Sequence, residues 1–288
     1  MKLLPPKVFI NIILASFIFC SCASLKTGNR PLYFIQMSDP QFGMFRKDTS
    51  FEKETINFTK AIMAANRLKP AFVIVTGDLV NKPFDADQIA EYKRVSELLD
   101  KRIPLYNVAG NHDTHNMPSE ENIADYNKIF GADYYKFEYG NMLGIVLNSM
   151  YLHSPQKVPA QALAQEQWLI KTLQQVKQNR YKHIMVFMHH PWFLEKADEP
   201  NQYFNIPLNT RKKYLDLFKA NDVKYLFSGH YHRNAFGTDG ELQMVTTGPV
   251  GMPLGKDSSG FRIIKVKGDK VEYPYYGLDE VPTRFDKE

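Results

Sequence analysis

The chain is poor in cysteine, and the two cysteines that it has, Cys20 and Cys22, both lie near the N-terminus. The rest of the sequence offers no thiolate, which excludes a cysteine nucleophile and a cysteine-ligated zinc site from the folded part. The sequence also lacks a strong charge of one sign, since the formal net charge of its 288 residues is +5. Because the lysines and arginines are scattered rather than clustered, we expect no nucleic-acid partner.

The hydrophobic run near the N-terminus, residues 8–19, is too short for a transmembrane helix. It follows the basic residues Lys2 and Lys7 and precedes a stretch of small residues. This order of a basic start, an apolar run and small residues is typical of a secretory signal. We therefore expect a lipoprotein signal peptide over residues 1–21, and a plain secretory signal or an uncleaved anchor are the alternatives.

Small residues flank Cys22, as they do at the cleavage site of bacterial lipoprotein signals. Phe19 departs from that pattern, because such signals usually carry leucine or another aliphatic residue there. Cys20 follows this bulky residue directly and is the poorer candidate. We expect lipidation of Cys22, a tether over residues 22–30, and an exported protein held by its lipid in the bacterial cell envelope, on its periplasmic side or its surface.

Residues 31–288 show no internal repeat, low-complexity tract or interdomain linker, which predicts one large domain, and we expect a monomer. In the first third of the chain, expected strands at 32–37, 71–76 and 104–109 alternate with expected helices. One helix has an apolar face formed by Phe58, Ala61, Ile62, Ala65 and Leu68. The next, capped by Asp85 or Asp87, has a face formed by Ile89, Tyr92, Ser96 and Leu99. This alternation predicts an α/β fold whose strand ends share one edge.

The third of these strands leads into Gly110-Asn111-His112-Asp113, which we interpret as a tight turn with Gly110 at positive φ. Asn111 offers an amide oxygen to a metal ion, and His112 exchanges protons near neutral pH. Asp113 is expected to hold the imidazole of His112 in one tautomer. Taken alone, these four residues are equally well explained as an ordinary polar turn.

Side chains of the kinds that bind metals follow five expected strand ends, including strands at 184–188 and 223–227. They are Asp39 with Gln41, Asp78, Asn111 with His112, His189, and His230 with His232. Each has an ordinary explanation as a turn or cap residue, but their shared place at one sheet edge favours a single site. Carboxylate, imidazole and amide groups suit two metal ions, which a carboxylate such as Asp78 can bridge. Such a pair polarises a phosphoryl group and generates a bridging hydroxide as the nucleophile.

The sequence resembles the calcineurin-like metallophosphoesterases over nearly all of the chain after the expected signal peptide. The resemblance rests on five blocks in order: Asp39-Pro40-Gln41, Gly77-Asp78, Gly110-Asn111-His112-Asp113, His189-His190-Pro191 and Gly229-His230-Tyr231-His232. It implies a four-layer αββα sandwich of the metallo-dependent phosphatase type. It implies one metal ion held by Asp39, Asp78 and His232 and a second held by Asp78, Asn111, His189 and His230.

The same resemblance places His112 beside the metal ions, where it stabilises the transferred phosphoryl group or protonates the leaving oxygen. Most of the superfamily has histidine where this chain has Gln41, whose amide oxygen is a weaker ligand than imidazole. The ions are divalent or trivalent, and manganese, iron and zinc all suit the residues. Further candidates for contact with the substrate are His190, Tyr231 and Arg233.

The resemblance implies a hydrolase of phosphate esters, and we expect phosphomonoesterase activity. Two alternatives stay open, a phosphodiesterase acting on nucleotides or lipid headgroups, and a catalytically weak surface lipoprotein that binds rather than cleaves. The motif residues are common to all of these. Specificity is expected in the loops at residues 44–50, at Met117 and at residues 192–207.

Overall fold

The computed structural model describes residues 31–176 and 181–285. The expected signal peptide, Cys22 and the tether lie outside these residues. Within the described ranges, no helix has both the length and the apolar character needed to cross a bilayer.

The first sheet gathers strands from both ends of the described chain. Its spatial order is β11-β10-β1-β2-β3, and β12 also pairs with β10. The bounds are β1 (Leu32–Met37), β2 (Val73–Val75), β3 (Leu105–Asn107), β10 (Gly260–Lys267), β11 (Lys270–Glu272) and β12 (Tyr275–Gly277). The three early strands are parallel, so they all end at the same edge. They lie where the sequence predicts strands, although β2 and β3 are shorter than expected.

The second sheet has the order β4-β5-β6-β7-β9-β8. The bounds are β4 (Tyr135–Tyr139), β5 (Met142–Val146), β6 (His183–Phe187), β7 (Tyr225–Ser228), β8 (Ala235–Asp239) and β9 (Leu242–Thr246). Its four central strands are parallel, and the two outer strands run antiparallel to them. The carboxyl ends of β6 and β7 therefore also lie at one edge.

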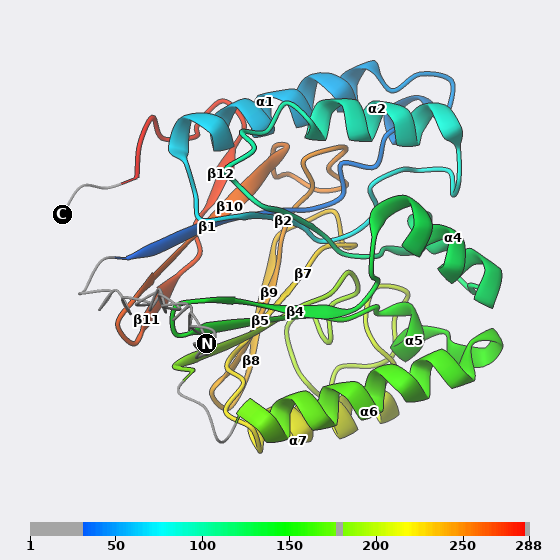
Figure 1. Ribbon diagram of the computed structural model, residues 1–288, viewed down its shortest axis with the longest axis vertical. Coiled ribbons are helices and arrows are strands. Elements are labelled where there is room, and N and C mark those ends of the chain that lie inside the picture. Colours follow the sequence, from blue (N-terminus) through cyan, green and yellow to red (C-terminus); the bar gives the residue numbers. More distant parts are fainter. Residues whose placement is uncertain (1–30, 177–180, 286–288) are drawn as a thin grey trace, which may run out of the picture.

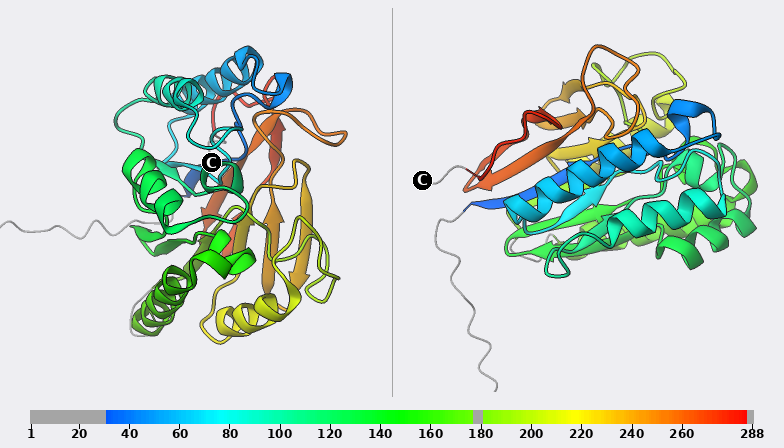
Figure 2. Two further views of the ribbon diagram at one scale, coloured as in Figure 1. Left: turned by 90° about the vertical axis from the view of Figure 1, so that its right-hand side faces the viewer. Right: turned by 90° about the horizontal axis from the view of Figure 1, so that it is seen from above.

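Helices cover the outer faces of both sheets and complete the αββα sandwich, which confirms the expected fold class. Helices α1 (Glu52–Leu68) and α2 (Ala86–Ser96) lie over the first sheet, and α6 (Pro159–Val176) and α7 (Leu208–Lys219) lie over the second (Figure 1). The left view of Figure 2 shows the strands between these two layers of helices. The shorter elements are α3 (Asn111–Thr114), α4 (Glu120–Phe130), α5 (Met150–His153) and two 3₁₀ turns at Met44–Arg46 and Pro155–Lys157.

A core of aromatic side chains holds the two sheets face to face. Phe34 stacks on Phe72 within the first sheet, and Phe187 stacks on Phe227 within the second. Phe34 also meets both rings of the second sheet edge-on, with centroids 6.0 and 6.2 Å away. All four side chains are fully buried. Because such contacts depend on ring geometry as well as on buried area, they fix how the two sheets lie against each other.

Helix α1 buries the predicted apolar face, but the buried face of α2 differs from the prediction. It consists of Gln88, Tyr92 and Val95 rather than Ile89 and Ser96. Gln88 is buried because its side-chain oxygen accepts from two backbone N–H groups in the loop after β2. A polar group satisfied in this way is stable in the interior, so an apolar period cannot reveal it. The cap of α2 is Asp85, whose carboxylate accepts from two N–H groups of the first turn.

Candidate metal centre

The strand ends of both sheets carry buried polar side chains into one cluster. From the first sheet, Asp39 follows β1, Asp78 follows β2 and Asn111 follows β3. From the second sheet, His189 follows β6, and His230 and His232 follow β7. All six side chains are at least 95% buried. The structure therefore brings together residues that are up to 193 positions apart in the sequence.

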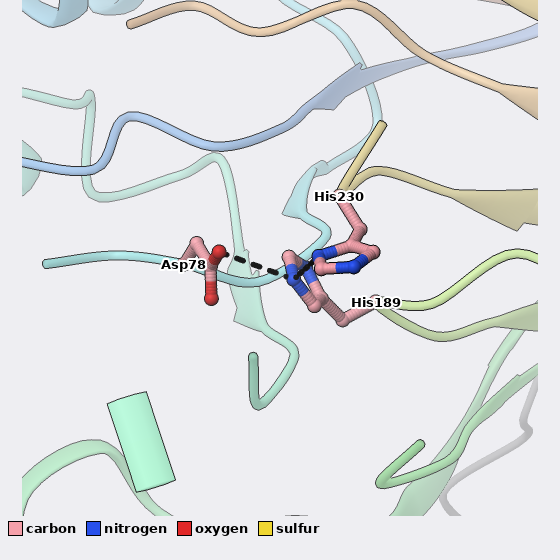
Figure 3. Close-up of side chains that lie close together, drawn as sticks. All are labelled: Asp78, His189 and His230. Atoms are coloured by element: carbon pink, nitrogen blue, oxygen red, sulfur yellow. Dashed lines mark hydrogen bonds and ion pairs between the residues drawn. The ribbon is translucent and has the colours of Figure 1, made fainter. Parts of the chain in front are cut away.

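Two groups in this cluster have the composition and spacing of metal sites. One consists of Asp39, Asp78 and His232, and the other of Asp78, His189 and His230. In each group the ligand atoms lie within 4.8 Å of one another. Figure 3 shows the second group, in which His189 Nε2 lies 3.2 Å from Asp78 Oδ2 and 3.1 Å from His230 Nδ1. Asp78 belongs to both groups, as a ligand that bridges two ions requires.

The three histidines are oriented so that each presents a lone pair to the centre. In each ring the outer nitrogen faces a backbone carbonyl: His189 Nδ1 faces Thr76 at 2.9 Å, His230 Nε2 faces Tyr203 at 3.4 Å and His232 Nδ1 faces Met252 at 2.6 Å. A carbonyl only accepts, so in the neutral ring the proton sits on this outer nitrogen. The inner nitrogen is then free to bind a cation, which is the usual arrangement around a bound metal. The residues thus fit a pair of metal ions.

Electrostatics favour a cation at the same point. Burial alone lowers the pKa of His189, but the negative charges of Asp78 and Asp39 outweigh it and raise the pKa to about 9. The centre therefore attracts positive charge, and in the absence of a metal ion a proton on His189 supplies it.

The backbone at these positions is strained. Five of the residues predicted as ligands adopt a positive φ, between 40° and 67°, although none is glycine: Asp39, Gln41, Asp78, His230 and His232. Each such residue costs about 1–3 kcal/mol and persists only where the surroundings enforce it. Strain of this kind concentrates at functional sites, and here it coincides with the clustered donors.

Two glycines let the halves of the centre approach each other. A Cβ atom on Gly77, from the first sheet, would overlap the side chain of His189. A Cβ atom on Gly229, from the second sheet, would overlap the side chains of Ser38 and Asp39. Each sheet therefore needs a glycine where it meets the other sheet's donors.

The motif that begins at Gly110 differs locally from its predicted form. Gly110 has a φ of −107°, not the expected positive value, and residues Asn111–Thr114 form one helical turn. Glycine is required at position 110 for a different reason, since a Cβ atom there would overlap the backbone and carboxylate of Asp78. The close approach lets the N–H of His112 donate to Asp78 Oδ1 at 2.8 Å.

The structure also corrects the expected pairing of Asp113 with His112. His112 Nδ1 lies 2.5 Å from the carbonyl of Asn81, which fixes the tautomer and leaves Nε2 available for proton transfer. The carboxylate of Asp113 instead accepts from the backbone N–H groups of Leu79, Val80 and Gly110. Asp113 thus joins the loops after β2 and β3, while a backbone carbonyl orients the histidine.

The surroundings of Asp113 disfavour its negative charge. Burial and the nearby charge of Asp78 raise the pKa of Asp113 to about 7, against the opposing effect of its hydrogen bonds to backbone N–H groups. A second buried negative charge so close to Asp78 is unfavourable without a cation. The carboxylate therefore matches a centre that carries additional positive charge.

Both amide side chains in the cluster have unsatisfied groups. Gln41 Nε2 donates to Asn81 Oδ1 at 3.1 Å, but Gln41 Oε1 is buried without a hydrogen-bond partner among the described residues. Asn111 Oδ1 lies 2.9 Å from His189 Nε2, and its Nδ2 is likewise buried and finds no partner in the ranges that the structure covers. Unpaired buried polar atoms are costly, so these groups suit a bound ion or substrate.

The three residues expected to contact the substrate lie around the centre in different settings. His190 is buried, with its ring 4.1 Å from that of His230 and its Nδ1 2.8 Å from Ser149 Oγ. Arg233 lies over the ring of Tyr231 at 4.8 Å and donates to a backbone carbonyl through Nε.

A cavity of about 340 Å³ adjoins the centre at Asn111 and His112. Its other walls are mostly polar, from Asp48, Asn81, Lys82, Pro83, His115 and Asn116.

Sequence reasoning missed several residues that shape the centre. Asn81 orients both His112 and Gln41, and Ser38 hydrogen-bonds to the carboxylate of Asp39. Both lie within a few residues of a motif, which is the signal that could have found them. Tyr203 and Phe204 pack against His230 from the loop at 192–207, which has no periodic pattern to reveal them.

Fold and cluster together define a protein of the metallo-dependent phosphatase class. A family model described as Calcineurin-like phosphoesterase matches residues 32–234, and the chain belongs to this family. It is 40% identical over 270 residues to the human Serine/threonine-protein phosphatase CPPED1, an alignment that covers 88% of this chain and 86% of the relative.

Two solved structures share the fold at low sequence identity. One is a dimetal phosphatase from Danio rerio, with a TM-score of 0.65 and 15% identity over 86% of this chain and 96% of the other. The second is GAP50, described as the anchor in the inner membrane complex of Plasmodium, with a TM-score of 0.66 and 13% identity over 88% of this chain and 86% of the other. Family membership and the phosphatase relatives support a hydrolase acting on phosphoric ester bonds that uses divalent metal ions.

Proposed function

We propose that this chain is a phosphomonoesterase with a dinuclear metal centre. Asp39, Asp78 and His232 hold one ion, with the side-chain oxygen of Gln41 as a fourth, neutral donor. Asp78, Asn111, His189 and His230 hold the second. The observation that carries this proposal is that Asp78 belongs to two buried ligand groups, each drawn from both sheets. Manganese, iron and zinc all suit a set of carboxylate, amide and imidazole donors.

A pair of bound metal ions supplies Lewis acidity, which polarises the phosphoryl group and activates water for attack. The chain's own residues then position and protonate. His112, with Nδ1 held by Asn81, exchanges a proton through Nε2 with the leaving oxygen. The Nδ2 group of Asn111 is an available donor for a phosphoryl oxygen. Asp113 keeps the loops that carry these groups in register.

The decisive experiment measures hydrolysis of p-nitrophenyl phosphate and of its bis ester, with Mn²⁺ and after chelation. We expect metal-dependent turnover with the monoester preferred. A preference for the diester would replace the proposal with a phosphodiesterase, and no turnover of either ester or of a broad panel would favour a binding protein. His112→Ala is expected to retain its metal ions and to lose roughly 10²–10⁴ in kcat. Normal turnover by this variant would remove the role of His112.

We also propose that residues 31–288 form the catalytic domain of an exported bacterial lipoprotein. Residues 1–21 would be removed as a signal peptide, Cys22 would carry the lipid, and residues 22–30 would tether a monomeric domain to the envelope. The basic start, the apolar run and the small residues around Cys22 support this proposal. Labelling with a radioactive fatty acid is expected for the native chain and not for Cys22→Ala. Equal labelling of the variant would point to Cys20 instead.

A further inference from the structure

A rigid loop presents two aromatic side chains beside the candidate metal centre. Tyr203 and Phe204 lie in the loop between β6 and α7, and their ring centroids are 5.0 and 5.7 Å from that of His230. Tyr203 is 55% exposed, among the largest values for an apolar or aromatic side chain in the described residues. Exposed aromatic surface next to polar donors is typical of a ligand-binding site.

A buried cation holds the loop in place. Arg211, in the first turn of α7, is fully buried and donates to the carbonyls of Ala197, Glu199 and Ile206 over 2.8–3.1 Å. Burying a guanidinium is costly unless its donors are satisfied, and here backbone carbonyls satisfy them. The hydrogen bonds of the buried guanidinium group therefore fix the path of the loop.

The carboxylate of Glu199 ties the same loop together from within. It accepts hydrogen bonds at 2.7–3.2 Å from the backbone of Leu194, Glu195 and Lys196 and from the side chain of Asn205. The two residues between Gln202 and Asn205 are Tyr203 and Phe204, and the N–H of Gln202 donates to Asn205. The aromatic pair thus projects from a closed frame rather than from a loose segment.

Tyr203 contacts the centre through its backbone carbonyl as well as through its ring. Its carbonyl faces His230 Nε2 at 3.4 Å and so helps to set the orientation of that ring. Phe204 packs its ring edge-on against Tyr231 at 5.0 Å, which supports its position beside the centre.

We propose that Tyr203 and Phe204 form an aromatic shelf that binds the ester group of the substrate, so that the preferred substrates are phosphate esters of aromatic alcohols. This inference rests on the proposed phosphomonoesterase function. The shelf begins one ring contact from His230, so an aryl group joined directly to a phosphate on the metal ions can reach it. A nucleobase is set further away by its sugar. Stacking and edge-to-face contacts then favour an aryl over an alkyl group.

The test compares kcat/KM for O-phosphotyrosine and O-phosphoserine, which share one amino-acid scaffold. The intrinsic reactivity of each ester is the same whichever variant is tested. A change in the ratio of the two kcat/KM values therefore reports on the shelf and not on the esters themselves. Tyr203→Ala is expected to lower the tyrosine-to-serine ratio about five- to tenfold, mainly through KM. Tyr203→Phe is expected to keep the ratio within twofold, because the ring is retained.

Phe236→Ala is the matched control, because Phe236 is 50% exposed and stacks on Tyr273. We expect its ratio to equal that of the unmodified protein, and equal melting temperatures would show that the variants are folded. An unchanged ratio in Tyr203→Ala would overturn the shelf. So would an equal loss in Tyr203→Phe, which would assign the effect to the hydroxyl group. Adenosine monophosphate is measured alongside, and a loss confined to this substrate would overturn the proposal by assigning the two rings to a base.

A binding measurement separates failure of the shelf from failure of the proposed function. Calorimetric titration with phenylphosphonate and methylphosphonate needs no turnover. We expect the phenyl compound to bind about five- to tenfold more tightly, and Tyr203→Ala to remove that preference. Absence of turnover with this preference intact would reject the phosphomonoesterase and retain the shelf. Equal binding of both phosphonates by the unmodified protein would reject the shelf.

Discussion

The two sheets bring different chemistry to the same point. The first sheet ends in oxygen donors, with Asp39, Asp78 and Asn111 after three successive strands. The second sheet ends in nitrogen donors, with His189, His230 and His232 after two. Each candidate metal group contains residues from both sheets, so neither sheet alone carries a complete site. We call the donors of the first sheet the oxygen half of the centre and those of the second sheet the nitrogen half.

This division separates charge from geometry. The oxygen half carries the negative charge that draws a cation, and the nitrogen half has imidazole rings that backbone carbonyls hold in position. Gly77 and Gly229 let each half touch the donors of the other. The halves are joined by the aromatic core between the sheets, so packing far from the centre sets the distances within it.

The largest effect is expected where the two halves share one residue. Asp78→Asn removes the charge common to both metal groups, and we expect loss of at least one ion and roughly a 10³-fold fall in kcat. Metal content by mass spectrometry and turnover of p-nitrophenyl phosphate measure this. Asp87→Asn, at an exposed position of α2, serves as the control. Two tightly bound ions in Asp78→Asn would contradict the shared role.

A second substitution pushes the halves apart without replacing a donor. Gly229→Ala places a methyl group against Ser38 and Asp39, and overpacking of this kind costs about 1–3 kcal/mol. We expect lower thermal stability and weaker metal binding together. Gly248→Ala is the milder comparison, because the added atom would lie 3.1 Å from the hydroxyl group of Tyr275, a tight contact that a small shift of that side chain relieves. Equal melting temperatures for both variants would show that the halves can move apart at no cost.

The charge of the oxygen half also predicts how metal binding depends on pH. In the metal-free protein the pKa of His189 is raised to about 9, so at neutral pH the ring carries a proton that a metal ion must displace. Raising the pH removes that proton, and apparent affinity for Mn²⁺ should increase by up to about tenfold per pH unit below pH 9. Calorimetric titration at pH 6.5, 7.5 and 8.5 tests the sign. Affinity that falls over this range would contradict it.

The smallest effect is expected from moving a nitrogen donor into the oxygen half. Gln41→His replaces an amide oxygen with imidazole and should tighten zinc binding by about three- to tenfold. Loss of the hydrogen bond to Asn81 opposes this gain. Gln41→Met, which removes the polar acceptor at similar length, should weaken binding. If neither variant changes the affinity, Gln41 does not contribute to the centre.

The sequence predicts which polar side chains the structure brings together, because each follows a strand whose apolar character is plain, as at Leu32–Met37 and His183–Phe187. It does not predict how they are held. The pairing of His112 with Asn81 uses a backbone carbonyl, which has no residue type to recognise. Gln88 is a polar residue on the buried face of α2, and it is stable there because backbone N–H groups donate to its side chain. These partners also have no residue type that the sequence could reveal. Gly110 was expected at positive φ, and only the three-dimensional closeness of Asp78 reveals why it is glycine.

The split between the sheets also has a consequence for the order of synthesis. The oxygen donors all precede residue 112, and the clustered histidines begin at residue 189. A nascent chain therefore displays every carboxylate of the centre long before the first of these imidazoles leaves the ribosome. Exposed carboxylates alone hold transition metals weakly and without selection. Metal capture is thus deferred until the chain has been made as far as His232 and the two sheets have met, so a loaded centre shows that both sets of donors are in place.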